Sequence, residues 1–158
     1  MIKADMEFFK KNYIKYGLIM SGVTVLCLLL MQITGQNQTF DNKSPIQLIA
    51  QFVAPLIVWF FGIKARKKEL KNKLTYKQGL LEGFKISLVY AIVSPFIFMF
   101  YYLFINPAIL ESVRKIYHLT NTSDAMIIGS DMLAQFIAAL IFGTIISAVL
   151  ATYLKTKS

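Results

Sequence analysis

The sequence predicts an all-α integral membrane protein, a four-helix bundle in a single domain spanning residues 1–158. Of these residues, 56% are hydrophobic and 16% are charged, against about 45–50% and about 25% in soluble domains. The charged residues also leave four long uncharged windows, and a helix needs roughly 20 apolar residues to cross a bilayer. We therefore place the spans at about 16–35, 45–63, 80–105 and 132–154.

The segment before the first span, residues 3–15, is expected to lie in the membrane interface as a short amphipathic helix. Its apolar residues recur every three or four positions, at Met6, Phe9, Tyr13 and Tyr16. The apolar run that follows is longer than the core of a signal peptide, and no small-residue cleavage site follows it. We therefore expect the first span to be retained.

The second and third spans carry helix-start signals. Ser44 followed by a proline suits the start of the second span. Thr75 and Gln78 have the spacing of a capping box, so the third helix should begin directly after Thr75, well before its apolar window. Pro55 and Pro95 are expected to kink the two helices within the membrane.

The loop between the third and fourth spans, residues 106–131, is expected to carry a second interfacial helix. Its expected apolar face is Ile109, Val113, Ile116 and Tyr117, opposite Glu111, Arg114 and Lys115. Residues 121–130 are polar and suggest a turn. Asp131 would then cap the fourth span, because carboxylates are favourable at helix N-termini.

The basic residues define an orientation. Segments 1–15, 64–85 and 155–158 hold 14 of the 17 Lys and Arg residues. The positive-inside rule places these segments in the cytoplasm, including both termini and the basic loop 64–79, and places loop 106–131 outside. The charge surplus predicts contact with anionic lipid headgroups and not with nucleic acid. The expected headgroup residues are Lys64, Arg66, Lys67, Lys68 and Lys71.

The fourth span carries the most specific pattern in the chain, a ridge of small residues. Helices in lipid associate where small side chains let their backbones approach. The ridge consists of Ala139, Gly143, Ser147 and Ala151 at four-residue spacing, with Gln135 one turn earlier and with Gly17 and Ser21 of the first span as the expected companion. It predicts packing within the chain or in a homodimer, and the alternative is a face that lines a substrate path.

An internal similarity suggests two tandem helical hairpins. Segments 51–57 and 135–141 share five of seven residues at an offset of 84. Such a repeat would relate the hairpins by an axis along the membrane normal. Chance matching within an apolar alphabet is the alternative explanation.

Few residues suggest chemistry. Gln47, Gln51 and Gln135 are expected to bond across helices, and Glu82 is expected to pair with Lys85 at the cytoplasmic surface. Cys27 and His118 lack the partners of a redox or metal site. Motifs for catalysis are also missing, so we predict no catalytic, cofactor-binding or metal-ligating residue and a protein that is not an enzyme.

Segments 74–83 and 101–111 resemble the signature of a bacterial four-span family known as domain of unknown function 4199. The likeness covers nearly the whole chain. It implies a location in the bacterial cytoplasmic (inner) membrane, and it implies no established activity. Family members often carry a longer, acidic helix after the Asn-Pro corner, and this helix is short here.

The expected function is helix packing with a second copy or with another membrane protein. One alternative is a subunit of a small-solute or ion transporter or channel, and another is a sensor of anionic lipid through the basic loop. Gln51 and Gln135 discriminate between the first two. Glutamines buried dry against each other would favour packing, whereas a water-filled cavity would favour transport.

Overall fold

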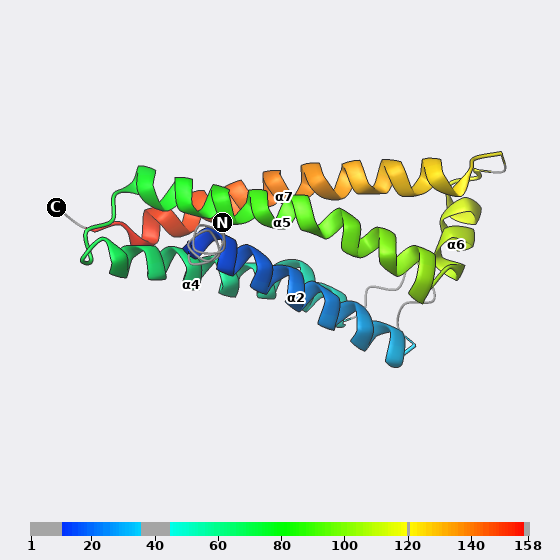
Figure 1. Cartoon of the computed structure of the whole chain (residues 1–158), viewed down its shortest axis with the longest axis horizontal. Coiled ribbons are helices and arrows are strands. Elements are labelled where there is room, and N and C mark those ends of the chain that lie inside the picture. The colour runs from blue at the N-terminus through cyan, green and yellow to red at the C-terminus, as the bar shows by residue number, and fades with distance from the viewer. Residues whose placement is uncertain (1–10, 36–44, 120, 157–158) are drawn as a thin grey trace, which may run out of the picture.

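The computed structural model describes residues 11–35, 45–119 and 121–156, which form helices and turns without a strand. Four helical spans, each long and apolar enough to cross a membrane, run side by side (Figure 1). They are α2 (Asn12–Ile33); α3 (Pro45–Leu48), η1 (Ile49–Val53) and α4 (Ala54–Glu69); α5 (Tyr76–Phe100) and η2 (Tyr101–Ile105); and α7 (Asp124–Leu154). The short α6 (Ala108–Ile116) joins η2 to α7. The protein is thus an all-α, multi-pass membrane bundle.

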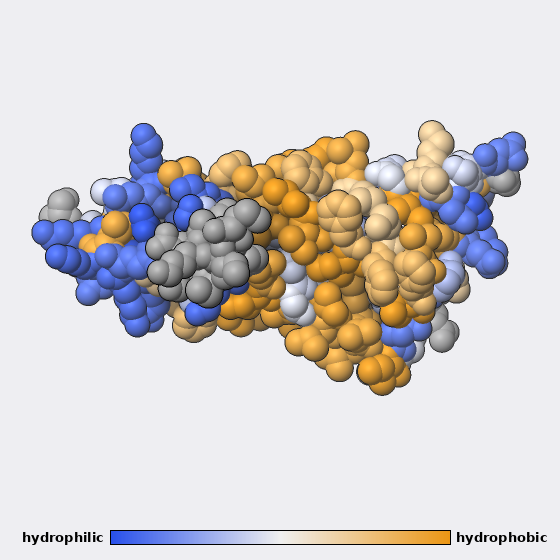
Figure 2. All heavy atoms as spheres, in the orientation of Figure 1, coloured by the Kyte–Doolittle hydropathy of each residue, from blue (hydrophilic) through white to orange (hydrophobic). Residues whose placement is uncertain are grey.

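The surface has the pattern of a membrane protein. Figure 2 shows a hydrophobic band around the middle of the molecule and hydrophilic residues at its two ends. Large apolar side chains of the spans, such as Leu26, Phe104 and Val149, are exposed. A soluble protein would bury most of these side chains, whereas here they can contact acyl chains.

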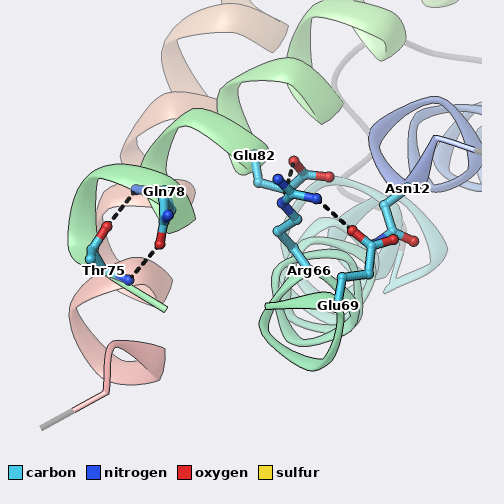
Figure 3. Close-up of polar contacts among 6 residues, drawn as sticks. All are labelled: Asn12, Arg66, Glu69, Thr75, Gln78 and Glu82. Atoms are coloured by element: carbon cyan, nitrogen blue, oxygen red, sulfur yellow. Dashed lines mark hydrogen bonds and ion pairs between the residues drawn. The ribbon is translucent and has the colours of Figure 1, made fainter. Parts of the chain in front are cut away.

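The N-terminal cap of α5 confirms the predicted capping box. The Thr75 Oγ1 atom accepts a hydrogen bond from the Gln78 backbone N–H at 3.3 Å. In return, the Thr75 backbone N–H donates to Gln78 Oε1 at 3.0 Å (Figure 3). These two bonds satisfy backbone donors that the first turn of a helix leaves free.

The start of α7 differs from the prediction. The Ser123 side chain caps the helix by accepting from the Met126 backbone N–H, so α7 begins at Asp124 and the turn expected over residues 121–130 is wrong. The first two turns are stabilised by Ile127 and Ile128, which are buried against the rest of the bundle. Asp131 therefore lies within the helix and does not cap it.

The two prolines are accommodated differently. In the second span the backbone forms the π-helical segment η1 immediately before α4, and Pro55 is the second residue of α4. A π turn is a common way to adjust the hydrogen-bond register near a helix irregularity. Pro95 lies inside α5, which stays helical. Beyond this region α5 bends away from α7, and α6 bridges the gap between them (Figure 1).

Helix α6 forms where an outer helix was expected, and its predicted apolar face is correct in part. Ile109 and Val113 pack against the core cluster of Tyr102 and Ile128, but the buried residue of α6 is Leu110, and Ile116 and Tyr117 are exposed. Arg114 Nη2 lies 2.7 Å from Asp124 Oδ1 and ties α6 to the start of α7. Thus α6 packs on the protein at the end of the bundle opposite the α4–α5 turn. Residues 3–10 of the expected N-terminal interfacial helix lie outside the described residues.

The two hairpins are not alike in detail. Pro55 and the preceding π turn interrupt the helix in the second span, whereas the matching segment of the fourth span, around Ala139, is regular α-helix. The tandem duplication stays a prediction.

Candidate functional site

The small-residue ridge of α7 packs against the protein's own α5. The two helices approach so closely that a Cβ atom added at Gly83 would lie 2.5 Å from the Ser147 Cβ. Three contacts follow one another along the antiparallel helices: Gly79 with Ala151, Gly83 with Ser147, and Ser87 with Gly143. Ser147 and Ala151 are fully buried as a result.

The companion ridge therefore lies on α5, and the expectation that Gly17 and Ser21 provide it is wrong. A Cβ atom at Gly17 would lie 2.6 Å from the Val89 Cβ, so Gly17 lets α2 approach a different face of α5. The buried Ser21 hydroxyl donates to the Gly17 carbonyl on its own helix at 3.0 Å. Because α5 lies between α2 and α7, it uses small residues on one face and Val89 on the other.

Beyond Gly143, towards α6, the helices enclose a cavity of about 460 Å³. All four spans and α6 line it. Its polar lining comprises Thr24, Gln47, Gln51, Trp59, Tyr90, Tyr101, Tyr102, Ser112, Asp131 and Gln135. The ridge of α7 is thus divided: its C-terminal half packs on α5, and its N-terminal half, with Gln135 and Ala139, faces the cavity.

The glutamines face this cavity instead of being buried against one another. Gln47 and Gln51 line it from α3 and η1, and Gln135 lines it from α7. Gln51 is exposed, and Gln135 interacts with Asp131 on its own helix. The structure therefore does not have the two glutamines buried against each other, and it has a cavity between them.

Asp131 is the acidic group of the cavity. The Tyr102 hydroxyl and the Gln135 amide interact with its carboxylate, but the Oδ2 atom is buried without a partner among the described residues. Asp131 lies 23 residues before the end of α7 at Leu154, which is about 34 Å of helix. Because the hydrocarbon core is about 30 Å thick, a bundle that spans it with Leu154 at one boundary has this carboxylate near the opposite boundary.

Trp59 and Tyr90 form the wall of the cavity at the end next to Gly143. Trp59 is almost fully buried, and its indole N–H donates to the Ser87 hydroxyl at 3.0 Å. The Tyr90 ring meets Trp59 edge-on at 6.2 Å, and the Tyr90 hydroxyl lies 3.1 Å from Thr24 Oγ1. These contacts fix rigid aromatic surfaces at the base of the cavity.

Part of the cavity wall is exposed at the surface of the bundle. Phe52 on η1 and Phe142 on α7 both line it, and their exposed fractions are 56% and 60%. Both lie in the apolar part of their spans. A molecule dissolved in the acyl chains could therefore enter between η1 and α7.

At the opposite, basic end of the bundle, Arg66 is held by two carboxylates. Its Nη1 atom lies 2.6 Å from Glu69 Oε2, and its Nε atom lies 3.9 Å from Glu82 Oε2 (Figure 3). Asn12 of α2 donates to Glu69 Oε1 at 2.8 Å. The expected Glu82–Lys85 pairing is replaced, since Glu82 is buried next to Arg66 and the Lys85 ammonium lies over the Tyr13 ring.

The other residues expected to bind headgroups fall into two groups. The Lys67 ammonium donates to the Leu154 carbonyl at 2.9 Å, where it satisfies an acceptor at the end of α7. The Lys64 ammonium lies over the Phe60 ring. Lys68 and Lys71 are exposed. Of the five predicted residues, Arg66 and Lys67 thus have partners within the protein, which reduces their availability to lipid.

Within residues 11–35, 45–119 and 121–156, no group of three or more His, Cys, Asp or Glu side chains could hold a metal ion. Cys27 is half-buried and lines the cavity. His118 is exposed in the turn after α6.

A family model described as "Protein of unknown function (DUF4199)" matches residues 15–156. No curated protein and no solved structure matches the chain.

Proposed function

The chain belongs to the DUF4199 family of proteins of unknown function, which confirms the resemblance seen in its sequence. We therefore propose a function from the geometry of the structure. The protein binds a small amphipathic molecule between its four spans and acts as the membrane-embedded subunit of a carrier for that molecule. The observation that supports this is the cavity between the spans, which Gln51 and Gln135 both line. Its size and its mixture of apolar walls with a few polar groups are typical of small-molecule sites.

The alternative function, packing with a second copy or another membrane protein, loses its main support. It rested on the ridge of α7, and this ridge is covered by α5 of the same chain. Association with another protein stays a prediction, and it would have to use a different face.

The proposal places the protein in the bacterial cytoplasmic membrane with both termini in the cytoplasm. The support is the distribution of basic residues. Most described lysines lie at the end of the bundle that holds the α4–α5 turn and the end of α7, whereas Arg114 and Lys115 lie at the other end. Anionic headgroups would meet the exposed Lys68 and Lys71. We also propose that the protein is not an enzyme, because its sequence lacks catalytic motifs.

Binding to the cavity can be tested with three probes of similar bulk: tetraphenylphosphonium, triphenylphosphine oxide and tetraphenylborate, which are a cation, a neutral molecule and an anion. The protein would be held in phosphatidylcholine nanodiscs, and empty nanodiscs would give the lipid background. We expect at least one probe to bind, and Ala138→Trp to abolish this binding because Ala138 lines the cavity.

The matched control is Ala134→Trp, one turn away on the same helix at an exposed position that does not line the cavity. It should bind the probes as the parent protein does. If no probe bound above background, or if both tryptophan variants bound as well as the parent, the proposal would be wrong.

A further inference from the structure

The cavity has an acidic side chain in its lining and no basic one. Among the described residues, Asp131 is the only Asp, Glu, Lys, Arg or His that lines the cavity. Its two partners, Tyr102 and Gln135, are neutral, and Oδ2 has no partner among the described residues. The other nearby acid of α7, Asp124, is paired with Arg114 outside the cavity. The lining therefore contains a carboxylate without a counter-charge.

A carboxylate in such a place favours a positively charged guest. Removing a charge from water costs several kcal/mol unless an opposite charge or hydrogen bonds compensate, and here the compensation by neutral groups is incomplete. Aromatic faces also attract cations through the negative face of the ring. The cavity is lined by Trp59, Tyr90, Phe98, Tyr101, Tyr102 and Phe142.

The guest must also be large and mostly apolar. A bare inorganic cation such as Ca²⁺ needs six or more oxygen ligands at about 2.4 Å, whereas this site offers one carboxylate and a few dispersed hydroxyl and amide groups. A volume of about 460 Å³ with aromatic walls suits an organic body. A single carboxylate balances a single positive charge.

We propose that the cavity is selective for hydrophobic, monovalent organic cations, with the charged centre beside Asp131 and the apolar body extending towards Trp59. This inference rests on the proposed function and narrows it to one ligand class. The orientation follows from depth: Asp131 lies near a boundary of the hydrocarbon core and Trp59 lies deeper. A cation entering sideways past Phe52 and Phe142 would keep its charge near the headgroups and its body in the apolar interior.

The test compares tetraphenylphosphonium with tetraphenylborate, which have the same shape and opposite charge, in the nanodiscs described above. We expect the parent protein to bind the phosphonium and Asp131→Asn to weaken this binding by about tenfold or more, because a buried charge partner is lost. Asparagine keeps the size and hydrogen-bonding capacity of the side chain, and Asp131→Glu, which keeps the charge, should retain most of the affinity. Binding of the borate should not weaken in Asp131→Asn.

Glu111→Gln is the control, since it neutralises an exposed acid of α6 that does not line the cavity, and it should leave phosphonium binding unchanged. Melting temperatures without probe will show whether each variant is folded. If Asp131→Asn is folded and binds the phosphonium as the parent does, or if the parent prefers the borate, the cation inference is overturned, although binding blocked by Ala138→Trp would still support the cavity. If none of the probes binds the parent, both proposals fail.

Discussion

Gly143 lies where three helices meet, and its lack of a side chain sets their spacing. A Cβ atom at this position would lie 2.6 Å from the Ser87 Cβ of α5 and 3.3 Å from Trp59 Cζ2 of α4. Trp59 in turn donates to the Ser87 hydroxyl. Because close packing replaces the hydrophobic effect in lipid, the contact at Gly143 stabilises the junction of α4, α5 and α7.

We expect Gly143→Ile to lower the free energy of unfolding by about 1–3 kcal/mol, since overpacking forces neighbouring side chains and backbone apart. The apolar substitution should still allow membrane insertion. Thermal unfolding in mild detergent would measure the loss, with Val149→Leu as control because Val149 is 63% exposed on the same helix. A melting temperature equal to the parent's, or a loss of oligomer with an intact monomer, would contradict the intramolecular role of this glycine.

The sequence predicts one side of this interface well and misses the other for a clear reason. The ridge of α7 is visible because its small residues repeat inside one uncharged window. Gly79, Gly83, Ser87 and Ala91 repeat at the same interval on α5, and this signal could have revealed the partner ridge. It begins in the charged approach to the third span, where Lys77, Glu82 and Lys85 interrupt the apolar window.

Among the structural elements, the C-terminal part of α4 joins a membrane span to the basic loop, and its charged side chains have two roles. Arg66 and Lys67 are directed to groups of the protein, Glu69 with Glu82 and the Leu154 carbonyl. Lys68 and Lys71 are exposed. Sequence alone does not separate these roles, since all are basic residues of one loop. The division depends on which side of α4 faces α5 and α7.

Lys68 and Lys71 should therefore contribute more of the contact with anionic lipid than Arg66 and Lys67 do. We expect the double change Lys68→Gln and Lys71→Gln to reduce selectivity for spin-labelled phosphatidylglycerol over phosphatidylcholine, because each lysine near the surface contributes about 1 kcal/mol of attraction. Added salt should reduce the difference between the variants. Electron paramagnetic resonance of the labelled lipid in reconstituted vesicles would measure it.

Arg66→Gln provides the comparison for the same element. It should lower the melting temperature, because it leaves the buried Glu82 without its cationic partner, and it should change lipid selectivity less than the double variant does. Equal losses of selectivity in the two variants would mean that the ion pairs of Arg66 do not keep it from lipid.

The helix boundaries show where sequence patterns are sufficient and where they are not. The capping box at Thr75 is a local pattern, and the structure has it. The start of α7 was missed because polar residues at 121–124 and at 130–131 flank the short apolar run 125–128, although Ser123 followed by Asp124 is itself a local N-terminal signal. The π turn before Pro55 and the burial of Leu110 in α6 depend on packing between elements, which no periodicity in the chain encodes.

For the molecule as a whole, four uncharged windows were sufficient to predict the bundle, whereas the cavity was not predictable. It arises because α5 and α7 pack closely at the ridge and diverge beyond it, with α6 bridging the gap (Figure 1). Residues far apart in the chain, such as Gln51 and Asp131, meet there only through this arrangement. The direction in which the cavity faces depends on the orientation of the bundle, which the basic residues predict.

That orientation can be tested with single cysteines in intact cells. We expect Asn121→Cys to react with a membrane-impermeant maleimide from outside, and Lys71→Cys to react only after the cells are permeabilised, because both positions are exposed at opposite ends of the bundle. The single native thiol, Cys27, would first be replaced by alanine. Lys43, a further expected outer position, lies outside the described residues. Labelling of Lys71→Cys but not Asn121→Cys in intact cells would show that the orientation is the reverse of the one proposed. Asp131 and its cavity would then face the cytoplasmic leaflet.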